Sequence, residues 1–118
     1  MTNNKQKLEL TWIGKNNPEY DIANIEPRIL EERTDLSYGD PNSENMIIHG
    51  DNLLALKALL PEYEGKIKCI FIDPPYNTGS AFKHYDDSVE HSTWLSLMKP
   101  RLELLFLLLD PEQGSILK

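Results

Sequence analysis

The tetrapeptide Asp73-Pro74-Pro75-Tyr76 combines residue types that can hold a planar amino group next to an aromatic surface. It directly follows residues 67–72, an apolar segment that we expect to form a buried strand. Two prolines fix φ and remove backbone N–H donors, so the carbonyl oxygens of Asp73 and Pro74 remain available to a ligand. The Asp73 carboxylate adds an acceptor and Tyr76 adds a stacking surface, which suits a nucleobase. Alternatively, the prolines only turn the chain and Tyr76 packs on the core.

A second polar segment, Gly50-Asp51-Asn52, follows the short apolar run at residues 46–49, which we also expect to be a buried strand. Asp51 is suited to cap a helix, because its carboxylate can accept from free backbone N–H groups. We expect that helix to end at Pro61. The leucines at helical spacing behind the cap are Leu53, Leu56, Leu59 and Leu60.

Strand, helix and strand within residues 46–72 make a βαβ unit, and the fold class is therefore α/β. A right-handed crossover places the carboxyl ends of both strands at one edge of the sheet. Ligands of open α/β sheets bind outside that edge. We therefore expect the loops at residues 50–52 and 73–76 to line one site.

The rest of the chain divides at residue 44 into a polar N-terminal extension, residues 1–44, and residues 45–118, which carry the α/β pattern. Within the extension we expect a short strand at residues 8–13 and a helical turn at residues 30–33. A long helix is predicted over residues 92–109, capped by Ser92 or Thr93 and kinked or broken at Pro100. Residues 114–118 are predicted to turn into a third strand.

Composition limits the function classes. The 118 residues carry 19 acidic against 12 basic side chains and a net charge of −7, which disfavours nucleic-acid binding by this chain alone. The single cysteine, Cys69, excludes an internal disulfide, and its position within a predicted strand indicates a buried core thiol. No apolar run is long enough to cross a bilayer and no signal peptide is evident, so we expect a cytoplasmic protein without a membrane partner.

A metal site is not predicted. Four residues of suitable type lie close together in the sequence, but their spacing matches no known metal-ligand pattern. They are His84, Asp86, Asp87 and His91.

Several segments resemble DNA methyltransferases. Residues 71–79, Phe-Ile-Asp-Pro-Pro-Tyr-Asn-Thr-Gly, are similar to motif IV of the enzymes that methylate adenine N6 or cytosine N4. Residues 45–56 resemble the strand and Gly-Asp-Asn-Leu segment that precede this motif in the β-class order, and residues 94–104 resemble the helix that follows it. Residues 8–15 and 26–30 resemble the start of the Mod subunits of type III restriction-modification systems.

This resemblance implies a partial Rossmann-like sheet of an S-adenosylmethionine-dependent methyltransferase, with helices on both faces and incomplete in this chain. It implies methyl transfer from S-adenosylmethionine to adenine N6 in DNA. The implied catalytic residues are Asp73, Pro74, Pro75 and Tyr76. The implied cofactor residues are Asp51 and Asn52. The residues implied at the base or DNA are Tyr76, Asn77 and Lys83.

The implied partners are double-stranded DNA, a second Mod subunit and a restriction (Res) subunit. In the β-class order the glycine-rich cofactor motif lies downstream of motif IV, and this chain lacks it, as it lacks a target-recognition region. We therefore expect the N-terminal part of a longer enzyme, inactive by itself. The alternatives are a cytosine-N4 methyltransferase and a non-catalytic remnant that only docks with other subunits.

Overall fold

The computed structural model describes residues 6–75 and 87–118. In the described part, helix α1 (Asn52–Tyr63) and helix α2 (Asp87–Leu108) accompany the short strands β1 (Cys69–Phe71) and β2 (Ser115–Leu117). Three 3-10 turns precede them: η1 (Pro18–Tyr20), η2 (Ile22–Asn24) and η3 (Thr34–Leu36). The predicted α/β class is confirmed.

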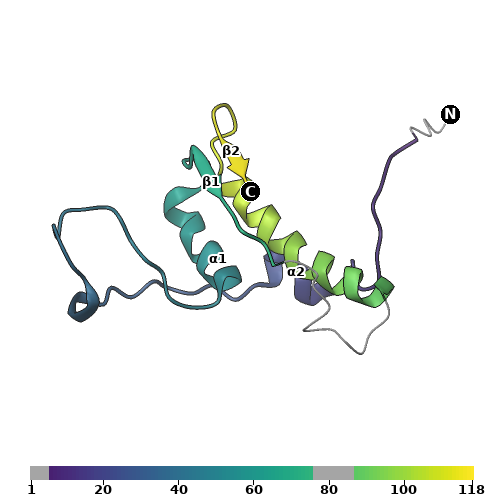
Figure 1. The fold of residues 1–118 in the computed structure, drawn as a ribbon, viewed down its shortest axis with the longest axis horizontal. Helices are drawn as coiled ribbons and strands as arrows, with labels where there is room; N and C mark the ends of the chain where they lie inside the picture. The colour runs from purple at the N-terminus through teal and green to yellow at the C-terminus, as the bar shows by residue number, and fades with distance from the viewer. Residues whose placement is uncertain (1–5, 76–86) are drawn as a thin grey trace.

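Strands β1 and β2 are parallel neighbours, with Ile70 paired to Ile116 (Figure 1). Helix α2 connects them, so the βαβ unit is β1–α2–β2. The predicted third strand is thus confirmed, and the strand predicted at residues 67–72 is present in a shorter form. A separate parallel bridge joins Ile67 to Leu109, the residue directly after α2.

The core lies where both helices meet β1. Ile70, Leu105 and Leu108 are buried there, and side chains of α1 pack around them. On alternate strand positions, Cys69 and Phe71 are exposed. The expectation of helices on both faces is therefore wrong for the described residues, because α1 and α2 both pack on the Ile70 side. The same alternation corrects the prediction of a buried Cys69 thiol.

Two predicted strands are absent. Residues 46–49 lie in an extended stretch with no ladder hydrogen bond among the described residues, and Ile47 is 99% exposed. Residues 8–13 are also not a strand, and Leu8 is fully exposed. An apolar run becomes a strand only where a neighbouring strand supplies ladder bonds and side-chain packing. The helical turn expected at residues 30–33 is likewise absent; η3 begins at Thr34.

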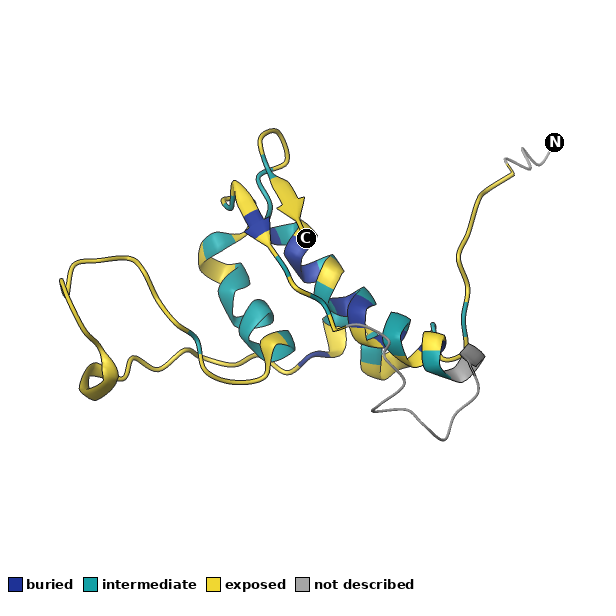
Figure 2. Ribbon diagram, in the orientation of Figure 1, coloured by how far each residue is buried: buried dark blue, intermediate teal, exposed yellow. Residues whose placement is uncertain are grey.

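Helix α2 begins at Asp87 and is unbroken through Pro100, so the predicted start at Ser92 or Thr93 and the break at Pro100 are wrong. Ser92 and Ser96 instead lie inside the helix, where they are buried by the N-terminal segment. The Ile13 backbone N–H donates to Ser92 Oγ at 3.1 Å, and Trp12 Nε1 donates to Ser96 Oγ at 2.9 Å. These bonds hold one part of the extension against α2, while most of residues 26–50 stay exposed (Figure 2).

Helix α1 starts at its predicted cap but passes Pro61 and ends at Tyr63. A proline in the last turn removes one backbone donor, and only two more helical residues follow it. Neither described helix has the combination of length and hydrophobicity that a bilayer crossing requires.

Candidate functional site

The segment Asp51–Asn52 forms the start of α1. Asp51 Oδ1 accepts from the backbone N–H of Leu53 at 2.8 Å and from that of Leu54 at 3.4 Å, which confirms the predicted N-cap. The Asp51 side chain remains 56% exposed. Its carboxylate therefore caps the helix and still faces solvent, where a ligand can reach it.

Arg101 of α2 reaches this same segment. Its Nε donates to Asn52 Oδ1 at 2.7 Å, and its guanidinium lies 3.8 Å from Asp51 Oδ1. Its Nη1 donates to the Leu97 carbonyl one turn back on α2, at 2.7 Å. The side chain is only 18% exposed, so the guanidinium is fixed between its own helix and the start of α1.

The segment Asp73–Pro75 leaves the end of β1. The Ile72 N–H donates to the Leu117 carbonyl at 2.8 Å, which continues the pairing with β2 by one residue. Residues 72–75 have no regular secondary structure, and Asp73 and Pro75 are exposed. Among the described residues, none donates a hydrogen bond to the Asp73 carboxylate. This carboxylate has its acceptor capacity available for a ligand.

Trp94 of α2 holds the end of this loop. Its Nε1 donates to the Pro75 carbonyl at 2.6 Å. The two predicted site segments are therefore both attached to the same helix, one through Trp94 and the other through Arg101. Tyr76, Asn77 and Lys83, which were predicted at the base, lie outside the described residues, as do His84 and Asp86.

Sequence reasoning missed both Trp94 and Arg101. They stand seven positions apart in the predicted helix, which places them on one face, two turns apart. Two hydrogen-bond donors at that spacing, beside the apolar stripe of the helix, were the only sequence signal that could have indicated these contacts. Their acceptors are a backbone carbonyl and a distant amide, which no local pattern reveals.

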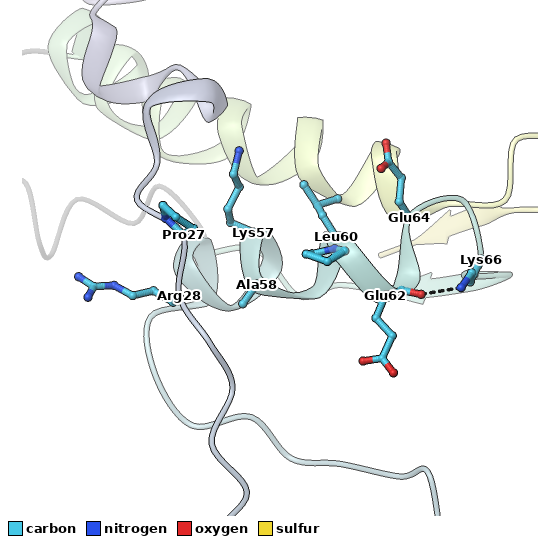
Figure 3. A pocket seen from close by; sticks show the side chains of 9 residues that line it. Pro27, Arg28, Lys57, Ala58, Leu60, Glu62, Glu64 and Lys66 are labelled. Atoms are coloured by element: carbon cyan, nitrogen blue, oxygen red, sulfur yellow. Dashed lines mark hydrogen bonds between the residues drawn. The ribbon is translucent and has the colours of Figure 1, made fainter.

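Two hollows lie elsewhere on the described surface. One, of about 370 Å³, lies between α1 and the chain at Pro27 (Figure 3). Its charged lining is mixed in sign, and two of its lysines are already engaged with backbone carbonyls: Lys57 with that of Ile22 and Lys66 with that of Glu62.

The other hollow, of about 390 Å³, has an apolar lining that includes Trp12, Trp94, Met98 and Phe106. Neither hollow contains Asp51 or Asp73. In residues 6–75 and 87–118, His, Cys, Asp and Glu side chains form no group of three that could hold a metal ion. The chemistry available in the described part therefore centres on the two carboxylates.

The stretch that contains the Asp73–Pro75 segment is similar to a known protein family. Residues 67–117 match the DNA methylase family, and they include β1, the Asp73-Pro74-Pro75 loop, α2 and β2.

Three relatives are Mod subunits of type III restriction-modification enzymes. A probable HindVI Mod subunit of Haemophilus influenzae is 54% identical over 58% of this chain and 9% of its own length. The EcoP15I Mod subunit of Escherichia coli is 32% identical, and the EcoPI Mod subunit of Escherichia phage P1 is 33% identical; each alignment covers 95% of this chain.

The chain spans about a fifth of the length of the EcoP15I and EcoPI subunits, 22% in each case. The alignments nevertheless cover nearly all of this chain. These matches confirm the predicted resemblance, and they fit this chain as part of the Mod subunit of a type III restriction-modification system.

Proposed function

We propose that this chain supplies the catalytic-loop part of a DNA methyltransferase that modifies adenine N6, within a longer protein of a restriction-modification system. The observation that carries the proposal is the placement of Asp73-Pro74-Pro75 at the carboxyl end of β1, inside the stretch that matches the DNA methylase family. Strand ends of this kind are where open α/β sheets bind ligands. In this proposal β1–α2–β2 is one unit of a larger Rossmann-like methyltransferase sheet.

The Asp73 carboxylate and the Pro74 carbonyl are proposed to activate the target amino group. An exocyclic amino group is a weak nucleophile because its lone pair is delocalised into the base. Two acceptors for its N–H groups favour a more tetrahedral nitrogen and free the lone pair. Positioning and electrostatics then provide most of the catalysis. The absence of a described donor to the Asp73 carboxylate supports this role.

Asp51 and Asn52 are proposed to hold the cofactor. S-adenosylmethionine, when bound, supplies an electrophilic methyl group on a sulfonium. Asp51 fits such a ligand because only its Oδ1 is used by the helix cap, and an exposed carboxylate can accept from a hydroxyl or an amino group. The glycine-rich part of the cofactor site is expected in segments beyond this chain.

The remaining site residues are proposed to handle the DNA. Tyr76 would stack on a base that has left the duplex, which is worth on the order of 1–3 kcal/mol per base. That offsets part of the few kcal/mol that flipping costs. Asn77 and Lys83 are proposed neighbours of the base and of the DNA backbone.

Double-stranded DNA, a second Mod subunit and a Res subunit are the proposed partners of the longer protein, and a cytoplasmic location is proposed with them. The net charge of −7 indicates that the basic surface for DNA phosphates lies in other segments. We also propose that residues 1–44 form an extension and that residues 45–118 form the catalytic part.

The test compares this chain with the full-length protein that contains it. Each is titrated with S-adenosylmethionine by calorimetry and then assayed for transfer of a labelled methyl group to DNA. We expect binding and transfer by the full-length protein, and neither by the 118 residues alone. Transfer by the short chain would refute the need for further segments. A full-length protein that binds no cofactor and transfers nothing would refute the enzyme and favour the non-catalytic docking alternative.

A further inference from the structure

Helix α2 is the one described element that is hydrogen-bonded to both site segments through side chains. We infer that Trp94 and Arg101 are positioning residues that set the distance between the base-side loop, Asp73–Pro75, and the cofactor-side segment, Asp51–Asn52. The inference rests on the proposed function, because it assigns a catalytic consequence to the spacing of those two segments.

The base-side loop needs an external donor. Pro74 and Pro75 have no N–H groups, so the loop cannot be closed by its own backbone donors in this stretch. Its last described carbonyl, that of Pro75, instead accepts from Trp94 Nε1 at 2.6 Å. A rigid indole on a helix therefore fixes the exit of the loop that carries Asp73. Removing only that N–H should leave the loop less well placed.

The cofactor-side segment is bonded to Arg101, whose own side chain is fixed by a hydrogen bond to its helix. Arg101 Nη1 is bonded to the Leu97 carbonyl, which leaves Nε directed at Asn52 and Nη2 near Asp51. A guanidinium can make these interactions together because its donors are arranged in a fixed plane. A lysine at this position would keep the charge beside Asp51 but would not reproduce the three-way arrangement.

The two attachment points have a fixed separation. Seven residues are nearly two helical turns, so Trp94 and Arg101 lie on one side of α2, about 10 Å apart along its axis. The helix between them is anchored, since Pro100 is fully buried and Met98 is buried. Methyl transfer requires each reacting atom to lie close to its position in the reactive geometry. A misplacement of about 1 Å can lower the rate on the order of 100-fold. A stiff spacer between the two segments provides that precision.

The kinetic test uses the full-length protein and separates kcat from KM. Trp94→Phe removes the indole N–H and should lower kcat about tenfold or more, with the KM for S-adenosylmethionine changed by no more than about twofold. Arg101→Gln should mainly raise that KM, by about tenfold, and Arg101→Lys should recover part of the loss.

Matched controls lie on the same surface. Trp12→Phe removes an indole N–H that is bonded to α2 at Ser96, and Lys99→Gln removes a cation of α2 that pairs with Glu103. The hydrogen bond of Trp12 and the ion pair of Lys99 both go to α2 and not to a site segment, so both controls should leave kcat and KM near the values of the unaltered protein. Site variants that behave like their controls would overturn the inference while leaving the proposed function intact.

Amide hydrogen exchange provides a readout that does not depend on activity. Trp94→Phe should speed exchange at Ile72, whose N–H donates to the Leu117 carbonyl, relative to Trp12→Phe. Arg101→Gln should speed exchange at Leu53 and Leu54, whose N–H groups bond Asp51, relative to Lys99→Gln. A protein that transfers no methyl group would refute the proposed function, whereas unchanged exchange in both site variants would refute the positioning role whether or not transfer is seen.

Discussion

The two site segments are built in opposite ways. Asp51 caps α1 through two backbone N–H groups and lies beside Arg101, which also binds Asn52. Asp73 receives no hydrogen bond from a described residue, and its loop is attached at Pro75 by a single indole N–H. The first carboxylate contributes to the stability of α1 in addition to its proposed role in binding the cofactor. Within residues 6–75 and 87–118 the second makes no side-chain hydrogen bond or ion pair, so we expect its replacement to affect chemistry more than stability.

The largest effect should come from replacing Asp73. Asp73→Ala in the full-length protein should lower methyl transfer by on the order of 10²–10³-fold or more, because an acceptor for the reacting amino group is removed. The unfolding midpoint should stay unchanged. Transfer is measured with labelled cofactor, and unfolding by circular dichroism.

Asp40→Ala is a matched control, since Asp40 is also an exposed aspartate in a loop. It should leave transfer intact. Retained activity in Asp73→Ala would refute the assigned role. Lost activity together with a lower unfolding midpoint would show that the contrast between the two segments is wrong.

The next effect concerns the helix that both segments share. Leu104 is fully buried on α2, and Leu104→Ala should lower the free energy of unfolding by about 2–5 kcal/mol through lost burial and a cavity. Urea unfolding of the full-length protein measures this. Exchange should rise at both site segments together. Faster exchange at only one of them would show that α2 does not support both.

Two replacements of Asp51 test the capping role and the proposed cofactor role of this carboxylate separately. Asp51→Ala removes the N-cap and should cost about 1 kcal/mol of stability, whereas Asp51→Asn keeps a capping oxygen and should cost little. If the carboxylate also binds the cofactor, both variants should raise the KM for S-adenosylmethionine. Urea unfolding and steady-state kinetics measure the two quantities separately. An unchanged KM in both variants would show that Asp51 caps the helix and does not bind the cofactor.

The smallest expected effect is a pH dependence of stability that arises from Asp110, outside the proposed site. The backbone N–H of Glu112 and, to a smaller extent, that of Gln113 donate to the Asp110 carboxylate. These hydrogen bonds hold its pKa below the ordinary value of 3.8. This contribution to stability is therefore present above about pH 4 and is lost as the pH falls through the lower folded value. The difference in urea midpoint between the unaltered protein and Asp110→Asn should be constant above pH 4 and change below it. A constant difference down to pH 2 would contradict this.

Local patterns predicted the parts of the fold that depend on nearby residues. The Asp51 cap, the apolar strand before Asp73 and the third strand near residue 116 were all predicted, because caps and short apolar strands have compact signals. Residues 46–49 and 8–13 carry the same strand signals, yet they form none. A strand requires a partner, and the described part of the chain supplies one only to β1 and β2.

The contacts that organise the site were beyond such patterns. Ser92 was predicted to cap a helix, but Ser92 and Ser96 lie inside α2 and accept hydrogen bonds from Ile13 and Trp12. Trp94 and Arg101 act across distances of 19 and 49 residues. Their partners are fixed by how α2 packs against β1 and α1, which is a tertiary property. The sequence therefore located the two carboxylates and the long helix, but not the Trp94 and Arg101 hydrogen bonds that join them.

The most direct measurement is the identity of the methylated nucleoside. DNA treated with the full-length protein and labelled S-adenosylmethionine is digested to nucleosides and separated by mass. The account predicts N6-methyladenine as the labelled product, and its loss in Asp73→Ala. Label in N4-methylcytosine, or N6-methyladenine formed equally by Asp73→Ala, would contradict it.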